Sequence, residues 1–120
     1  MKATELMIGD WVYRPDCYDK VKEIRENGII GRDYLRGIIS FTELEPIPLT
    51  TEILKKYGFV EKSERRWVLS DEYTGDEVLI LLEVAIGFAM ATAGLAIGIQ
   101  NVNELHLLFK LCGIDKEIEL

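Results

Sequence analysis

The sequence predicts an α+β fold. A small SH3-like β unit is expected over residues 1–48, followed by a unit over residues 49–120 in which an antiparallel sheet packs with two helices. Three observations predict it: hairpin and strand signals before residue 48, strict alternation of large and small residues between positions 88 and 99, and a capped amphipathic helix near the end.

The first unit reads as four or five short strands. Its opening, Ile-Gly-Asp-Trp-Val, places Trp11 and Tyr13 on one face of a strand and Val12 on the other. Asn27-Gly28 predicts a type I′ turn, which needs positive φ at both central residues. This turn is expected to join strands at 20–26 and 29–32, with a further strand at 37–41. So many short strands predict a curled SH3-like sheet, although an open meander fits as well.

Two prolines, Pro46 and Pro48, end the first unit. A short helix follows: Thr50 or Thr51 is expected to cap it, and Gly58 to end it in a left-handed conformation. Strands are predicted at 67–69 and 77–82. In the final helix Asn103 is the expected cap and Gly113 the stop, and the apolar stripe comprises Leu105, Leu108, Phe109 and Cys112.

Residues 78–99 are almost uninterruptedly apolar, with Glu83 as the only charge, and are long enough to cross a bilayer as a helix. The alternative is buried strands. Large side chains alternate with small ones along 88–92 and 95–99, and Ala93-Gly94 between them suits a tight turn. The flanks lack the basic and aromatic residues typical of a membrane helix. We therefore favour strands.

The predicted 88–99 hairpin has two unlike faces. Its large residues are expected to be buried beneath the final helix. The small residues, Ala91 and Ala96 among them, have no covering layer that the sequence makes obvious. We expect this face to support a homodimer.

Composition excludes several functional classes. The chain has 120 residues, 48% of them hydrophobic, and a net charge of −7. Up to Ser70 the numbers of acidic and basic residues are equal, and the whole excess of negative charge lies after Ser70. Such a charge disfavours direct binding to nucleic acid or to anionic lipid. Without an export signal, Cys17 and Cys112 are expected to be reduced, with Cys112 in the core, although pairing between them stays open.

Three stretches carry a family resemblance: the opening MKATELMIGDWV, the middle LEPIPLTTEILKKYGF and the ending NVNELHLLFKLCGIDKEIEL. Together they resemble small uncharacterised proteins of gut bacteria and of their phages or mobile elements. The resemblance spans the chain and implies a soluble, cytoplasmic protein without implying any activity. The alanines of the 88–99 hairpin depart from the more polar pattern of these relatives.

No catalytic or metal-binding motif stands out. His106 is expected to be a solvated helix residue, because metal binding needs further converging ligands. Cys17 lies far in sequence from this single histidine. Glu83 is expected near a strand end, where it can reach solvent or pair with a basic side chain.

The leading hypothesis is therefore a non-enzymatic interaction module of phage or mobile-element origin, with a protein partner and no cofactor. Its partner-binding candidates are Trp11, Tyr13 and Tyr34, together with Ala91 and Ala96 in the hairpin. Two alternatives remain. One is a metal-assisted hydrolase or nuclease accessory that uses Cys17 or the 71–77 carboxylates, and the other is an acidic decoy that mimics nucleic acid.

Overall fold

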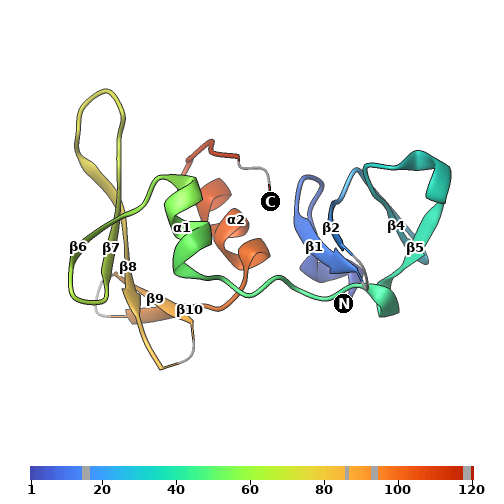
Figure 1. Ribbon diagram of the computed structural model, residues 1–120, viewed down its shortest axis with the longest axis horizontal. Helices are drawn as coiled ribbons and strands as arrows, with labels where there is room; N and C mark the ends of the chain where they lie inside the picture. Colours follow the sequence, from blue (N-terminus) through green and yellow to red (C-terminus); the bar gives the residue numbers. More distant parts are fainter. Residues whose placement is uncertain (15–16, 86, 93–94, 118–119) are drawn as a thin grey trace. The chain divides into compact units, whose positions relative to one another are not determined.

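The first forty residues form short strands in the computed structural model, which describes residues 1–14, 17–85, 87–92, 95–117 and 120 (Figure 1). The chain divides into two compact units. One combines Met1–Ile47 with Asn101–Ile114, and the other contains Pro48–Gln100 and part of the tail after Ile114. The final helix thus groups with the N-terminal strands, whereas the sequence placed it in the second unit. The domain boundary expected after residue 48 stays a prediction.

The first unit contains two antiparallel sheets. One pairs β1 (Trp11–Arg14) with β2 (Cys17–Lys20), and the other has the order β3 (Glu23–Arg25), β4 (Gly28–Ile30), β5 (Ile38–Ser40). Short 3-10 helices lie at Ala3–Glu5, Tyr34–Arg36 and Phe41–Glu43. The buried cluster of this unit comprises Leu6, Val12, Val21, Ile29, Ile39 and Leu44. The SH3-like arrangement stays a prediction.

The β3–β4 hairpin forms as expected, but its turn does not. The turn residues are Glu26 and Asn27, and Gly28 already pairs with Arg25 as the first residue of β4. Neither Asn27 nor Gly28 has a positive φ, so the predicted type I′ turn is wrong. Gly28 serves close packing instead, because a Cβ there would lie 2.2 Å from the carbonyl oxygen of Ile39 in β5.

Helix α2 (Val102–Leu111) ends the first unit. Its cap is Asn101, whose side chain accepts from the Glu104 N–H at 2.9 Å, and not Asn103 as expected. The helix starts after Asn101, whose backbone is extended, and the Val102 N–H, which has no acceptor within the helix, donates to the Ile47 carbonyl at 2.9 Å. Asn103 therefore lies inside the first turn, where it is 6% exposed. Gly113, with a φ of 70°, follows the helix as predicted.

The second unit is built on a five-stranded antiparallel sheet with the order β10-β9-β8-β7-β6 (Figure 1). Its strands are β6 (Val60–Ser63), β7 (Arg66–Ser70), β8 (Glu77–Glu83), β9 (Phe88–Thr92) and β10 (Leu95–Ile99). Helix α1 (Thr51–Tyr57) is capped by Thr50 and ends at Gly58 with a φ of 100°, as predicted. It lies beside β7, since Lys55 Nζ is 5.9 Å from the centre of the Trp67 ring.

The five-stranded sheet shows which of the two interpretations of residues 78–99 is right. Strands β8, β9 and β10 occupy this stretch, so the strand interpretation is confirmed and the α+β class with it. Of the predicted large face, Phe88 and Ile99 are buried, but Ile97 is 46% exposed. That the final helix covers this face stays a prediction. The Ala93-Gly94 turn lies outside the described residues. Among the residues that the structure describes, no helix is both long and apolar enough to cross a membrane.

Candidate interaction site

Two tyrosines lie side by side on the β1–β2 hairpin. The register of the hairpin pairs Tyr13 in β1 directly with Tyr18 in β2, next to the pair formed by Arg14 and Cys17. Their ring centroids are 5.8 Å apart, and the ring planes meet at 68°, an edge-to-face contact. Both remain accessible, with 38% of Tyr13 and 44% of Tyr18 exposed. The sequence named Tyr13 as a candidate but missed Tyr18, which the hairpin register brings opposite it.

Trp11 is in the same strand but is not accessible. Its side chain is 3% exposed, so the expectation of an exposed binding aromatic is wrong at this position. Two cations explain part of the burial: the guanidinium carbon of Arg32 lies 4.8 Å from the ring centre, and Lys20 Nζ lies 5.8 Å away. Both stack over the indole in cation–π geometry. The buried Trp11 side chain therefore has a structural role in the hairpin and is not accessible to a partner.

Asp19 is the ionic centre of this hairpin and is 5% exposed. Its Oδ1 accepts from the backbone N–H groups of Lys20 at 2.8 Å and Arg32 at 3.0 Å, and its Oδ2 accepts from the Arg14 guanidinium at 3.1 Å. Burial by itself raises the pKa of this carboxyl, but the three hydrogen bonds outweigh it and hold the pKa below its ordinary value of 3.8.

The remaining predicted candidates lie elsewhere. Tyr34 begins a 3-10 helix, but the structure does not describe its side chain. Ala91 in β9 and Ala96 in β10 are paired partners in the register of the second unit's sheet, and their side chains are likewise outside the description. Their roles in partner binding and in dimerisation stay predictions.

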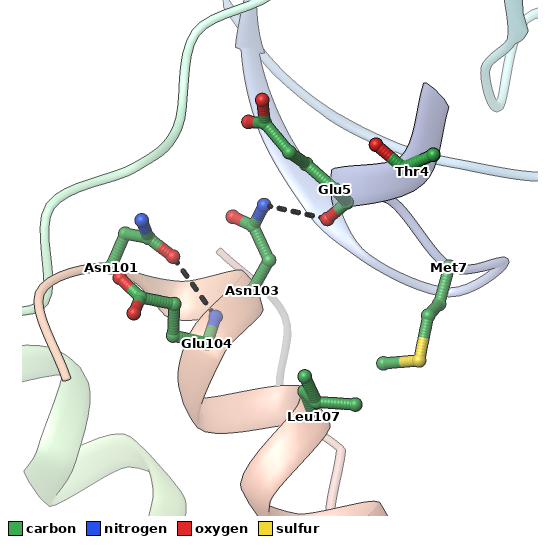
Figure 2. Close-up of a pocket in the computed structure, with 7 residues that line it drawn as sticks. All are labelled: Thr4, Glu5, Met7, Asn101, Asn103, Glu104 and Leu107. Atoms are coloured by element: carbon green, nitrogen blue, oxygen red, sulfur yellow. Dashed lines mark hydrogen bonds between the residues drawn. The ribbon is translucent and has the colours of Figure 1, made fainter. Parts of the chain in front are cut away.

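A pocket of about 400 Å³ lies beside the start of α2 in the first unit (Figure 2). The segment containing the first 3-10 helix supplies one wall, and the cap and first turns of α2 supply the other. Its lining residues are Thr4, Glu5, Met7, Asn101, Asn103, Glu104 and Leu107. The side chains of Met7 and Leu107 point toward one another at one end, and the carboxylates of Glu5 and Glu104 lie toward the other (Figure 2).

Asn103 is the least expected member of this pocket. Its Nδ2 donates to the Glu5 carbonyl oxygen at 3.4 Å. Its Oδ1 is buried and has no hydrogen-bond partner among the described residues. Because a carbonyl oxygen only accepts, the NH₂ group must face Glu5, and Oδ1 must face the side on which Asn101 lies (Figure 2). The sequence pattern predicted a capping role for Asn103 and did not indicate this buried acceptor.

His106 is held by a buried carboxylate and is not the solvated residue expected. Its Nδ1 hydrogen-bonds Oδ1 of Asp10, whose side chain is 0% exposed, against 17% for the imidazole. The other oxygen of Asp10 accepts from the Met7 N–H at 2.8 Å. Since a carboxylate only accepts, Nδ1 carries the proton. No sequence signal links these two residues, which are 96 positions apart.

Three of the four 71–77 carboxylates have separate partners. Asp71 accepts from the N–H groups of Tyr73 and Thr74, which lowers its pKa, while Glu72 pairs with Lys116 and Glu77 with Arg66. Within the described ranges, no three His, Cys, Asp or Glu side chains are grouped so as to hold a metal ion.

The other singled-out residues have structural placements. Cys17 and Cys112 are both free and exposed, so the expected core position of Cys112 is wrong: it lies just past the end of α2. Glu83 ends β8, as predicted, and accepts from the Trp67 indole N–H at 2.6 Å. Its partner is thus an aromatic donor instead of a basic side chain.

Comparison with known proteins adds no family. A scan against protein-family models and searches of the curated proteins and the solved structures found no match for this chain. The family resemblance stays a prediction.

Proposed function

We propose that this protein is a non-enzymatic interaction module that binds an extended segment of a partner protein across Tyr13 and Tyr18. The observation that carries the proposal is the exposed edge-to-face pair formed by these two rings. Tyrosine presents a large, rigid contact area with a polar tip, which makes it frequent at protein-binding surfaces.

The backbone beneath the pair supports this role, because it holds the rings in place before a partner arrives. On one side β1 pairs with β2. On the other, the N–H of Tyr13 donates to the Glu45 carbonyl at 2.9 Å, and the Glu45 N–H donates back at 2.8 Å. A preorganised surface loses less conformational entropy on binding.

We further propose that the first unit acts as an SH3-like module. Small antiparallel sheets that present paired aromatics are suited to extended, proline-containing segments, whose polyproline II conformation is already low in entropy. This part of the proposal rests on an analogy between folds and on the tyrosine pair.

The experiment is a binding screen of proline-rich peptides, followed by titration of the best peptide against three proteins. We expect Tyr13→Ala and Tyr18→Ala each to weaken binding about tenfold or more, as loss of an aromatic anchor does. Tyr73→Ala is the matched control, because Tyr73 is 97% exposed and lies outside the first unit. If Tyr13→Ala and Tyr18→Ala bind as the wild type does, or if no peptide binds, the proposal is wrong.

A further inference from the structure

Glu45 adds one charged position to the surface formed by the two tyrosines. Tyr13 and Glu45 form an antiparallel bridge in which each backbone N–H donates to the other residue's carbonyl, at 2.9 and 2.8 Å. Tyr13 is also the register partner of Tyr18. Residues directly opposite one another in antiparallel segments place their side chains on the same face. Tyr18, Tyr13 and Glu45 therefore form one row across three neighbouring segments of the first unit.

The backbone hydrogen bonds set the spacing within this row. The N–H and the C=O of Tyr13 both point toward Glu45, so neither is directed at Tyr18. Tyr13 and Tyr18 thus form a non-hydrogen-bonded pair, the kind in which cross-strand side chains lie closest. On the other flank of Tyr13, directly opposed residues have Cβ atoms about 5 Å apart. A group that contacts the Tyr13 ring can therefore also reach the Glu45 carboxylate.

The Glu45 carboxylate is available to such a group. Glu45 is exposed, and its side chain has no hydrogen-bond or ion-pair partner among the residues that the structure describes. Glu23, in β3 of the same unit, differs in this respect, because its carboxylate pairs with Arg25 at 3.0 Å. The negative charge beside Tyr13 is thus not neutralised by a described side chain of the protein itself.

The next row of the same face carries the opposite charge. Lys20 follows Tyr18 by two positions in β2 and therefore shares its face. Lys20 Nζ and the guanidinium carbon of Arg32 lie over the Trp11 ring, at 5.8 and 4.8 Å from its centre. A cation that approaches this face meets two positive charges at the Trp11 row and one negative charge at Glu45. The charges therefore direct a cation to the Glu45 end.

We propose that Glu45 makes the tyrosine surface selective for partner segments that carry an arginine. This inference rests on the proposed binding at Tyr13 and Tyr18 and names the chemistry of the partner. The planar guanidinium would stack on the Tyr13 ring and donate two hydrogen bonds to the carboxylate, a geometry that a lysine ammonium does not reproduce. The same hairpin already contains one such stack, in which Arg32 covers Trp11.

The probe is the tightest proline-rich peptide from the binding screen, acetylated and amidated. It is resynthesised with arginine, the uncharged isostere citrulline, lysine or glutamate at each position in turn, and calorimetry gives each Kd with the full-length protein. At positions near one end of the peptide we expect arginine to bind about fivefold more tightly than citrulline, the upper range for one exposed charge pair. Lysine should lie between them, and glutamate should bind most weakly. Raising the salt from about 20 mM to about 300 mM should reduce the advantage of arginine.

Two variants of Glu45 assign this preference to its side chain. Glu45→Gln keeps the side-chain size and the backbone bonds to Tyr13, and it should bring the affinities of the arginine and citrulline peptides together. Glu45→Lys should make the glutamate peptide bind more tightly than the arginine peptide, because the charge at this position is reversed. Glu26→Gln is the matched control: Glu26 is an exposed carboxylate in the turn between β3 and β4, and this variant should keep the arginine preference. Amide NMR spectra check that all three variants are folded.

The inference is overturned if arginine and citrulline bind the wild type equally, if arginine strengthens binding equally at every position, or if Glu45→Gln keeps the arginine preference. Equal affinities for lysine and arginine would show that charge alone is selected and that the guanidinium geometry is wrong. In each of these cases, binding of the citrulline peptide that still depends on Tyr13 and Tyr18 leaves the tyrosine surface intact. Binding that does not depend on the tyrosines, or a screen without any bound peptide, overturns both proposals.

Discussion

Asp19 accepts more hydrogen bonds in the first unit than the residues around it in the sequence would predict. It accepts from two backbone N–H groups and one guanidinium while only 5% exposed. Asp19→Asn removes the charge that these donors stabilise. We expect the free energy of unfolding to fall by about 3 kcal/mol at pH 7, as when a buried ion pair loses one partner. Denaturant unfolding of both proteins measures the difference.

The same residue predicts a pH dependence. The folded-state pKa of Asp19 lies below its ordinary value of 3.8, so the unfolded chain takes up this proton first as the pH falls. The stabilisation by Asp19 is complete well above pH 3.8 and is lost as the pH drops through the lower folded pKa. The gap between wild type and Asp19→Asn should therefore narrow between pH 5 and pH 2. A gap that stays constant or widens contradicts this assignment.

Substitution of Gly31 tests how tightly the Asp19 carboxylate is packed. A Cβ at Gly31 would lie 2.2 Å from Asp19 Oδ2, whereas a Cβ at Gly98 in β10 would meet nothing within 4 Å. Neither glycine has a positive φ, so alanine strains neither backbone. We expect Gly31→Ala to destabilise by about 1–3 kcal/mol through overpacking and Gly98→Ala to change stability by less than about 0.5 kcal/mol. Thermal unfolding with calorimetry compares the two, and equal effects would argue against the enclosure.

At the scale of elements, the bond between His106 and Asp10 ties α2 to the residues before β1. His106→Ala leaves the buried Asp10 carboxylate without this donor, and we expect a loss of about 2 kcal/mol, typical of a hydrogen bond to a charged group. Leu111→Ala is the control on the same helix, because Leu111 is 76% exposed. Urea unfolding measures both. If the two variants are equally stable, the bond contributes nothing.

Elements with a strict apolar period could be predicted from the sequence, and elements held by polar contacts could not. Strands β9 and β10 have the predicted bounds because large and small residues alternate at every position. Strand β6 was missed because all four of its residues are exposed and carry no apolar alternation. The sequence did not indicate the burial of Asp10, Asp19 and Asn103. Their hydrogen-bond partners lie far away in the chain or are backbone groups.

At the scale of the whole molecule, self-association is the remaining prediction. Ala91 and Ala96 are paired on neighbouring strands of the five-stranded sheet. If the small-residue face forms a twofold interface, as we expect, light scattering will report a dimer for the wild type and a monomer for Ala91→Lys. Ala85→Lys, at an exposed alanine just before the hairpin, should leave the dimer intact. A wild-type monomer at high concentration contradicts the prediction.

The first unit is discontinuous in the sequence, and this has a consequence for biosynthesis. Met1–Ile47 leave the ribosome before Pro48–Gln100, and Asn101–Ile114, which complete the unit, follow only after that whole segment has been translated. Until then the Asp10 carboxylate has no His106 to bind, and the Glu5 carbonyl has no Asn103. Met1–Ile47 must therefore wait for Asn101–Ile114, so the first unit completes its folding only after residue 114 has left the ribosome.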